Sequence, residues 1–102
     1  MELKPGSRWK SAVCDAEVVV VRGAKEPRVL ECGGHAMVPY AADRPAGLMA
    51  AADRSDGVLT GKRYVDEESA VEILCSKAGK GSLSMDGRPL QVKAAKALPS
   101  SD

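Results

Sequence analysis

Aromatic residues are scarce in this chain. Its 102 residues include no phenylalanine, one tryptophan and two tyrosines, so aromatic residues make up 3% of the composition. Because large aromatic side chains usually dominate a core, this core has to be built from aliphatic residues and methionine around Trp9. A chain of this length forms one domain. We therefore predict a single domain over residues 1–102, of modest stability that a metal or a partner subunit would raise.

The sequence also lacks an excess of either charge and any long hydrophobic run. Its 15 basic and 14 acidic residues are spread along the chain and give a net charge of +1, without the basic clusters typical of nucleic-acid-binding surfaces. The start of the chain, MELKPGSRWK, has no apolar stretch of a secretory signal, and no apolar run approaches the roughly 18–20 residues of a membrane span. We expect a soluble, cytoplasmic protein with reduced cysteines that binds neither nucleic acid nor membranes.

Strand-like segments begin near the N-terminus. Alternation in residues 8–14 predicts an edge strand, and the valine run of EVVVVR, residues 17–22, predicts an inner strand buried on both faces. Residues 23–27 contain Gly and Pro and predict a hairpin loop that returns through residues 28–32.

The register of this predicted hairpin has a consequence for the cysteines. If Arg22 faces Arg28, Val18 lies beside Cys32, and the same register brings Cys14 close to residues 35–36. Because side chains alternate along a strand, a slip of one residue would reverse every face.

The C-terminal half contains further strand signals. Residues 61–66 and 71–77 predict two strands joined by a turn, with Val71, Ile73 and Cys75 on one face. The Asp86-Gly87 pair predicts a type I′ hairpin turn. Four residues around this turn are expected to share its buried face: Leu83, Met85, Leu90 and Val92. Pro89 places its strand at a sheet edge, because proline donates no ladder hydrogen bond.

Short strands joined by tight turns, without alternating βα units, predict an all-β fold, or a mainly β fold with one short helix. We expect a small antiparallel sandwich or barrel built from hairpins. Residues 41–57 are expected to form a loop or a short helical insertion that starts near Pro45. Residues 1–8 and 94–102 are expected to be flexible ends.

The stretch ECGGHAMVP, residues 31–39, contains the only histidine and one of the three cysteines. Cys32 and His35 form a Cys-x-x-His pair, and the glycines between them permit the positive φ that a metal knuckle needs. The predicted hairpin adds Cys14 as a third ligand, and Cys75 is the candidate for a fourth. The sequence therefore gives one candidate metal site, for zinc, on Cys14, Cys32 and His35.

Residues 14–35 resemble one half of a zinc ribbon, although the first knuckle has one cysteine where that family has two. Three alternatives stay open. The stretch can be a metal-free turn with Cys75 in the core, since buried cysteine packs as a small hydrophobe. Met37 beside Cys32 and His35 is a soft ligand set suited to copper transport. Cys14 or Cys32 with His35 is also a candidate nucleophile pair.

The function expected first is that of a non-catalytic binding module or accessory subunit of a larger complex, with a protein partner or a second copy of the chain. The reasons are the thin core, the few catalytic side chains and the little room for a cleft. The string AGKGS, residues 78–82, lacks the spacing of a phosphate-binding loop and is expected to form a turn. The alternatives are a zinc-ribbon-like metal-binding protein and a small cysteine-dependent enzyme.

Overall fold

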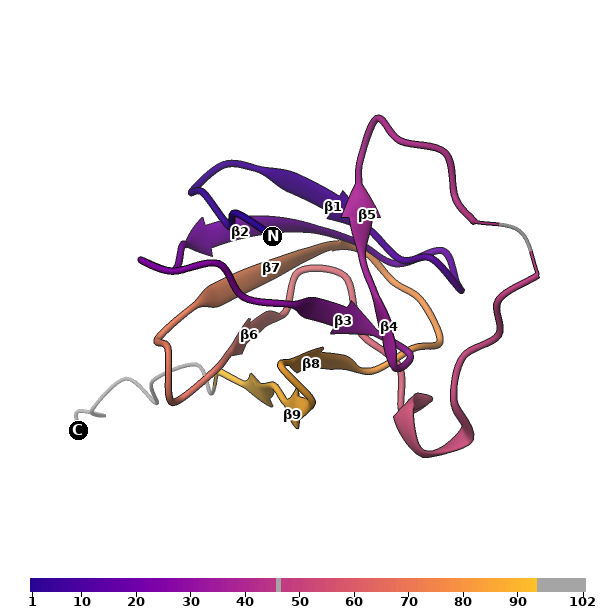
Figure 1. The fold of residues 1–102 in the computed structure, drawn as a ribbon. Helices are drawn as coiled ribbons and strands as arrows, with labels where there is room; N and C mark the ends of the chain where they lie inside the picture. The colour runs from indigo at the N-terminus through magenta and orange to yellow at the C-terminus, as the bar shows by residue number, and fades with distance from the viewer. Residues whose placement is uncertain (46, 94–102) are drawn as a thin grey trace, which may run out of the picture.

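A computed structural model describes residues 1–45 and 47–93, which form two antiparallel β-sheets (Figure 1). Across the larger sheet, the strands are in order β10 (Gln91–Val92), β6 (Arg63–Val65), β7 (Glu72–Lys77), β2 (Glu17–Arg22), β1 (Arg8–Lys10) and β5 (Val38–Pro39). The smaller sheet has the order β4 (His35–Ala36), β3 (Leu30–Cys32), β8 (Leu83–Met85) and β9 (Arg88–Pro89). The predicted all-β antiparallel fold is confirmed, and neither sheet closes into a barrel within the described part of the chain.

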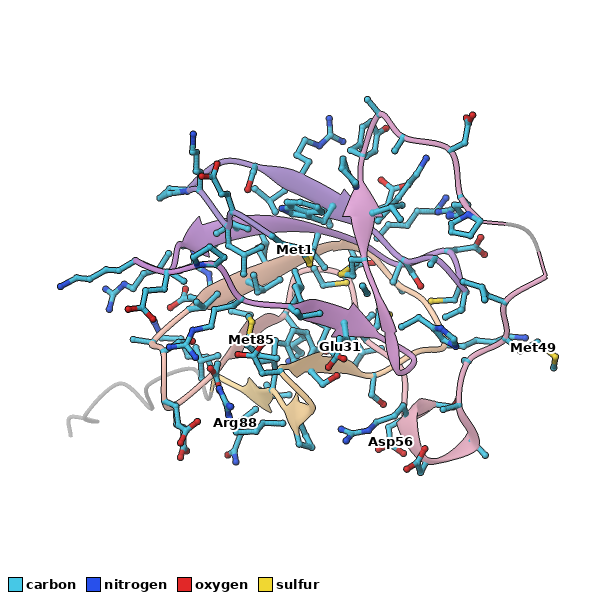
Figure 2. The ribbon with its side chains drawn as sticks, in the orientation of Figure 1. Met1, Glu31, Met49, Asp56, Met85 and Arg88 are labelled. Carbon is cyan, nitrogen blue, oxygen red and sulfur yellow. The ribbon has the colours of Figure 1, made fainter. Side chains whose placement is uncertain are left out.

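The two sheets share one core. Strands β2 and β7 of the larger sheet and strands β3 and β8 of the smaller sheet contribute most of its side chains. Met1 lies between the sheets in Figure 2, and its sulfur accepts a hydrogen bond from the Leu30 N–H at 3.3 Å. The buried cluster consists of Leu3, Ala16, Val18, Val20, Leu30, Cys32, Met37, Val58, Tyr64, Val71, Ile73, Cys75, Leu83 and Met85.

Strand β2 is an inner strand, as predicted, since it lies between β7 and β1. The prediction that it is buried on both faces is wrong. Val18 and Val20 are buried in the core, whereas Val21 on the other face is 39% exposed. The valine run therefore covers one face of the sheet with core side chains and leaves the other face partly open. The predicted edge position of residues 8–14 is also wrong, because β5 pairs with the outer side of β1.

The predicted hairpin between residues 17–22 and 28–32 does not form. Strand β2 pairs with β1 and β7, and β3 belongs to the other sheet. The N-terminal residues explain the difference, because they hydrogen-bond to the connection that was expected to be a tight loop. Leu3 O accepts from Ala24 N at 3.3 Å, and Met1 O accepts from Arg28 N at 3.2 Å. The connection therefore leads from one sheet to the other.

The C-terminal strands agree better with the sequence-based predictions than the N-terminal strands do. Val71, Ile73 and Cys75 are all buried, as predicted for one face of this segment. Asp86 and Gly87 both have positive φ, of 50° and 82°, as a type I′ turn requires.

The sequence predicted two further features of this hairpin. Strand β9, which contains Pro89, is an edge strand as predicted. Leu83 and Met85 are buried, but Val92 is 56% exposed and pairs with Tyr64 in the larger sheet. The expectation that all four residues share one buried face is therefore wrong for Val92, because the chain changes sheets after β9.

The segment between β5 and β6 extends to one side of the sheets (Figure 1). Where described, it is a loop with one 3₁₀ helix, η1 (Ala52–Arg54). At the N-terminus, Leu3 is 2% exposed and packs in the core. The expectation for residues 94–102 lies outside the described residues. No helix within residues 1–45 and 47–93 is long and apolar enough to cross a membrane.

Asp66, which directly follows β6, forms an ion pair with Arg88. Its Oδ2 accepts a hydrogen bond from Arg88 Nη2 at 2.9 Å and another from Ser69 Oγ, and its side chain is 4% exposed. Burial raises the pKa of Asp66, but the hydrogen bonds from Arg88 and Ser69 outweigh it and lower the pKa below the ordinary value. Folding therefore gains stability from the charged form above the unfolded-state pKa of about 3.9 and loses it as the pH falls through the lower folded-state pKa.

We expect Asp66→Asn to lower the free energy of unfolding at pH 7 by about 1–3 kcal/mol, because a charged hydrogen bond is lost from a buried position. The difference from the wild type should shrink as the pH is lowered below about 4, where the wild-type carboxylate becomes protonated. Urea unfolding at several pH values measures both effects.

The control is Glu68→Gln. Glu68 also contacts Arg88, at 2.9 Å, but its side chain is 67% exposed, so the loss should stay below about 1 kcal/mol. Equal losses for the two variants, or a pH-independent loss for Asp66→Asn, would contradict the assignment.

Candidate functional site

Cys14 lies in the loop between β1 and β2, which Ser11 holds together. The Ser11 Oγ accepts hydrogen bonds from the N–H groups of Val13 at 3.0 Å and Cys14 at 3.1 Å. The Ser11 N–H donates to the carbonyl of Ala16 at 2.9 Å, and Ser11 itself is fully buried. Because its oxygen accepts two bonds, the hydroxyl proton is left to donate to a neighbouring sulfur.

Cys32 is the last residue of β3 and is fully buried. Its Sγ lies 3.8 Å from the Sγ of Cys14, and both are free thiols. The two sulfur atoms are therefore close together, although the hairpin that was expected to bring Cys14 near residues 35–36 does not form. They come instead from a loop of the larger sheet and a strand of the smaller sheet.

A turn with two glycines packs against the pair. A Cβ atom on Gly79 would lie 2.8 Å from Cys14 Sγ and 2.5 Å from Ala16 N. A Cβ atom on Gly81 would lie 2.8 Å from Cys32 Sγ. Any side chain at these positions would collide with a sulfur or with backbone, so the approach requires glycine.

The surroundings of Cys14 favour its thiolate. Burial raises the pKa of this thiol, but hydrogen bonds from Ser11, from the N–H groups of Ala16 and Gly81, and from Cys32 outweigh burial. The net effect is a pKa below the ordinary value of the thiol. Cys14 is also partly exposed, so it combines thiolate character with access from solvent.

Cys32 has the opposite character. Burial raises its pKa to about 12 against the effect of a hydrogen bond from Ser11, and negative charge on Cys14 and on Cys75 acts in the same direction as burial. Burial also raises the pKa of Cys75, whose thiol donates to the carbonyl of Lys77 at 3.1 Å. The two buried thiols therefore favour the protonated form, and Cys14 is the one of the three cysteines whose pKa is lowered.

His35 points to a backbone group. Its Nε2 lies 3.0 Å from the carbonyl oxygen of Met49. Among the described residues no hydrogen bond joins His35 to Cys14 or Cys32, and the ring instead ties β4 to the segment between β5 and β6. Met37, the candidate copper ligand, is 3% exposed and packs in the core.

The metal hypothesis stays a prediction. Cys14 and Cys32 are close enough to bind the same metal ion, but the third expected ligand, His35, hydrogen-bonds to Met49. Within residues 1–45 and 47–93, no group of three or more His, Cys, Asp or Glu side chains has an arrangement that could hold a metal ion. The geometry supports a pair of thiols better than a tetrahedral Cys/His site.

A cleft of about 520 Å³ opens beside Cys14. Part of its lining comes from the loop after β1 and from the turn that contains Gly79, and its charged lining residues are Asp15 and Lys80. Leu59, which is 62% exposed, supplies an apolar wall. A small molecule in this cleft would reach Cys14.

Sequence reasoning did not find three residues that shape this site. Ser11, Gly79 and Gly81 were interpreted as parts of a strand and a turn, and only the two glycines on either side of Lys80 gave a signal. That signal indicates a close backbone approach, but the sequence does not say to what.

Comparisons with known proteins add nothing to this description, because no family model, no curated protein and no solved structure matches the chain.

A substitution of Cys75 tests whether this residue packs in the core or binds a metal. We expect Cys75→Val to change the free energy of unfolding by less than about 1.5 kcal/mol, because it exchanges one small apolar side chain for another. In the wild type, Cys75 should react with a thiol reagent only after Cys14 has done so. Urea unfolding and mass spectrometry of alkylated peptides measure the two effects.

Ile73→Ala is the matched control on the same face of β7, and should cost about 2–5 kcal/mol because it leaves a cavity. A loss of that size for Cys75→Val, or release of a bound metal, would show that Cys75 is a ligand.

A second prediction concerns His35. We expect His35→Ala to cost at most about 1.5 kcal/mol, the net value of one hydrogen bond, and to speed amide exchange in residues 47–51 because Met49 loses its anchor. The cost should be the same with and without EDTA.

The control is protein purified without a histidine tag and analysed for metal. Retained zinc, together with a destabilisation by His35→Ala that EDTA abolishes, would favour the Cys14–Cys32–His35 metal site, because a structural metal contributes to folding.

Proposed function

We propose that the protein is a non-catalytic binding module, an accessory subunit that offers the segment between β5 and β6 to a protein partner. The observation that carries this proposal is the exposure of the Met49 side chain on an anchored backbone. Its side chain is 81% exposed, while its own carbonyl is held by His35 at 3.0 Å. Figure 2 shows Met49 at the outer side of this segment, away from the sheets.

The segment is long, from the end of β5 at Pro39 to the start of β6 at Arg63. Loops of this length in a small domain usually carry function. It is also anchored at several points by hydrogen bonds to the sheets and their turns. Two of these are Ala51 N to Gly33 O at 2.8 Å and Arg54 Nη2 to Gly87 O at 2.8 Å.

Apolar side chains on this segment face solvent. Tyr40 is 42% exposed, Leu48 39%, Met49 81% and Leu59 62%. A backbone that is already ordered loses less entropy when a partner binds. Methionine adapts its flexible side chain to irregular surfaces. Both properties support a role in protein binding.

The other candidate functions have less support. A cysteine-dependent enzyme of the expected kind needs a cysteine–histidine pair, and His35 bonds to Met49 instead. A metal-binding role has two neighbouring thiols in its favour, but the third expected ligand, His35, bonds to Met49. As part of the proposal we place the protein in the cytoplasm, where reducing conditions maintain free thiols such as those of Cys14 and Cys32.

The proposal is tested by a photo-crosslinking amino acid at position 49 in the full chain, produced in the organism that makes it. We expect a crosslinked product of defined mass, because position 49 would lie inside the interface. Met49→Asp, placed in the same interface, should weaken the association at least about tenfold, which corresponds to about 1.4 kcal/mol.

The control position is Val21, which is 39% exposed and lies at the end of β2. A product at position 49 and none at position 21 supports the proposal, and a mass of twice the chain identifies a second copy as the partner. The same products at both positions, or none at position 49, would contradict it.

A further inference from the structure

We propose that Cys14 and Cys32 form a reversible dithiol–disulfide pair, in which Cys14 reacts first with a small two-electron thiol oxidant and Cys32 then closes the disulfide. This assignment is independent of the binding role proposed above. It concerns the thiols of Cys14 and Cys32 and a different chemistry, although Leu59 of the segment between β5 and β6 also lines the cleft beside Cys14.

The geometry provides the pair. The two sulfur atoms are 3.8 Å apart and 18 residues apart in sequence. A disulfide has a sulfur–sulfur distance of about 2.0 Å, so the two side chains have only a short approach to make. Both thiols are free, and the bond would join a loop of the larger sheet to a strand of the smaller one.

The surroundings assign different roles to the two thiols. Cys14 is partly exposed and accepts hydrogen bonds from the N–H groups of Ala16 and Gly81, which Cys32 lacks, and together with Ser11 and Cys32 these overcome burial and lower its pKa. Because the thiolate is the nucleophile, Cys14 is the attacking sulfur. Cys32 is fully buried, so a reagent from solvent meets Cys14 before it meets Cys32.

Oxidation of Cys14 prepares the second step. Burial raises the pKa of Cys32 to about 12, and the negative charge of Cys14 opposes its ionisation further. Once Cys14 is oxidised, that charge is gone. The Cys32 thiol then ionises more readily, next to the sulfur that it attacks.

Access is provided by the cleft of about 520 Å³ that includes Cys14. Its lining includes one basic and one acidic residue, Lys80 and Asp15. Because these two charges balance, the cleft does not favour a reagent of either charge. Its volume limits the oxidant to a small molecule, such as hydrogen peroxide or a low-molecular-weight disulfide.

With hydrogen peroxide, the Cys14 thiolate attacks one oxygen, a sulfur–oxygen bond forms, the oxygen–oxygen bond breaks and hydroxide leaves. Cys32 then attacks the Cys14 sulfur, a sulfur–sulfur bond forms, and the hydroxyl group leaves with the Cys32 proton as water. The two cysteines lose two electrons, and the peroxide gains them.

With a small disulfide, the Cys14 thiolate attacks one sulfur and releases the other as a thiolate, which leaves a mixed disulfide on Cys14. Cys32 then displaces the remaining small thiol, which leaves with the Cys32 proton. The same protein disulfide results, and the small disulfide has been reduced to two thiols.

The test treats the reduced full chain with hydrogen peroxide in one arm and with glutathione disulfide in the other. Remaining thiols are then alkylated, and peptides are mapped by mass spectrometry. We expect an intramolecular Cys14–Cys32 disulfide, with Cys75 still alkylated after denaturation. Dithiothreitol should restore all three thiols, and whichever arm reacts faster identifies the oxidant class.

Variants separate the two roles. Cys14→Ser should abolish the disulfide. Cys32→Ser should leave Cys14 trapped as a sulfenic acid, detected with dimedone, or as a glutathione mixed disulfide. Cys75→Val is the matched control and should form the disulfide at the wild-type rate. In the folded wild type at pH 7, iodoacetamide should modify Cys14 at least about tenfold faster than Cys75.

Mapping in the wild type keeps the proposal testable even if a variant fails to fold. A disulfide that includes Cys75, pairing only between chains, or no pairing in either arm would overturn it. A metal retained on Cys14 and Cys32 by the purified chain would overturn it too, because ligated thiols are not free to pair.

Discussion

The structure depends on a close backbone approach at one junction, where three glycines leave room for their neighbours. Gly79 and Gly81 lie against the sulfurs of Cys14 and Cys32, and a Cβ atom on Gly33 would lie 2.7 Å from the Val13 side chain. These contacts bring together a loop of the larger sheet, the end of β3 in the smaller sheet and the turn between β7 and β8. The relative position of the two sheets at this end therefore depends on residues without side chains.

The same junction creates the difference between the two thiols. Because the turn lies so close, the Gly81 N–H can donate to Cys14, which lowers the pKa of that thiol against the effect of burial. Cys32 lies deeper between the sheets, where burial raises its pKa to about 12. The packing that joins the sheets and the chemistry of the thiol pair thus have one physical origin.

The sequence could predict those features that depend on interactions between residues close together in the chain. The Asp86-Gly87 turn and the buried face of β7 depend on neighbours in sequence, so turn chemistry and alternation were sufficient. The pairing of β2 was decided by distant segments, namely β7 and the N-terminal residues that bond to the connection after it. The predicted register put Val18 beside Cys32 and Cys14 near residues 35–36, whereas in the structure the Cys14 sulfur lies 3.8 Å from that of Cys32. The sequence showed which residues were chemically notable, and tertiary packing decided how they meet.

The thiol pair and the exposed segment are mechanically connected through the backbone of the junction. The carbonyl of Gly33, next to Cys32, accepts a hydrogen bond from Ala51 at 2.8 Å, and the carbonyl of Ser11 accepts one from Arg44 Nε at 2.9 Å. The segments that carry Cys14 and Cys32 therefore also hold the loop that presents Met49. In the reduced protein, packing and hydrogen bonds hold these two anchors close together, and the disulfide proposed above would add a covalent bond between the two segments that carry them.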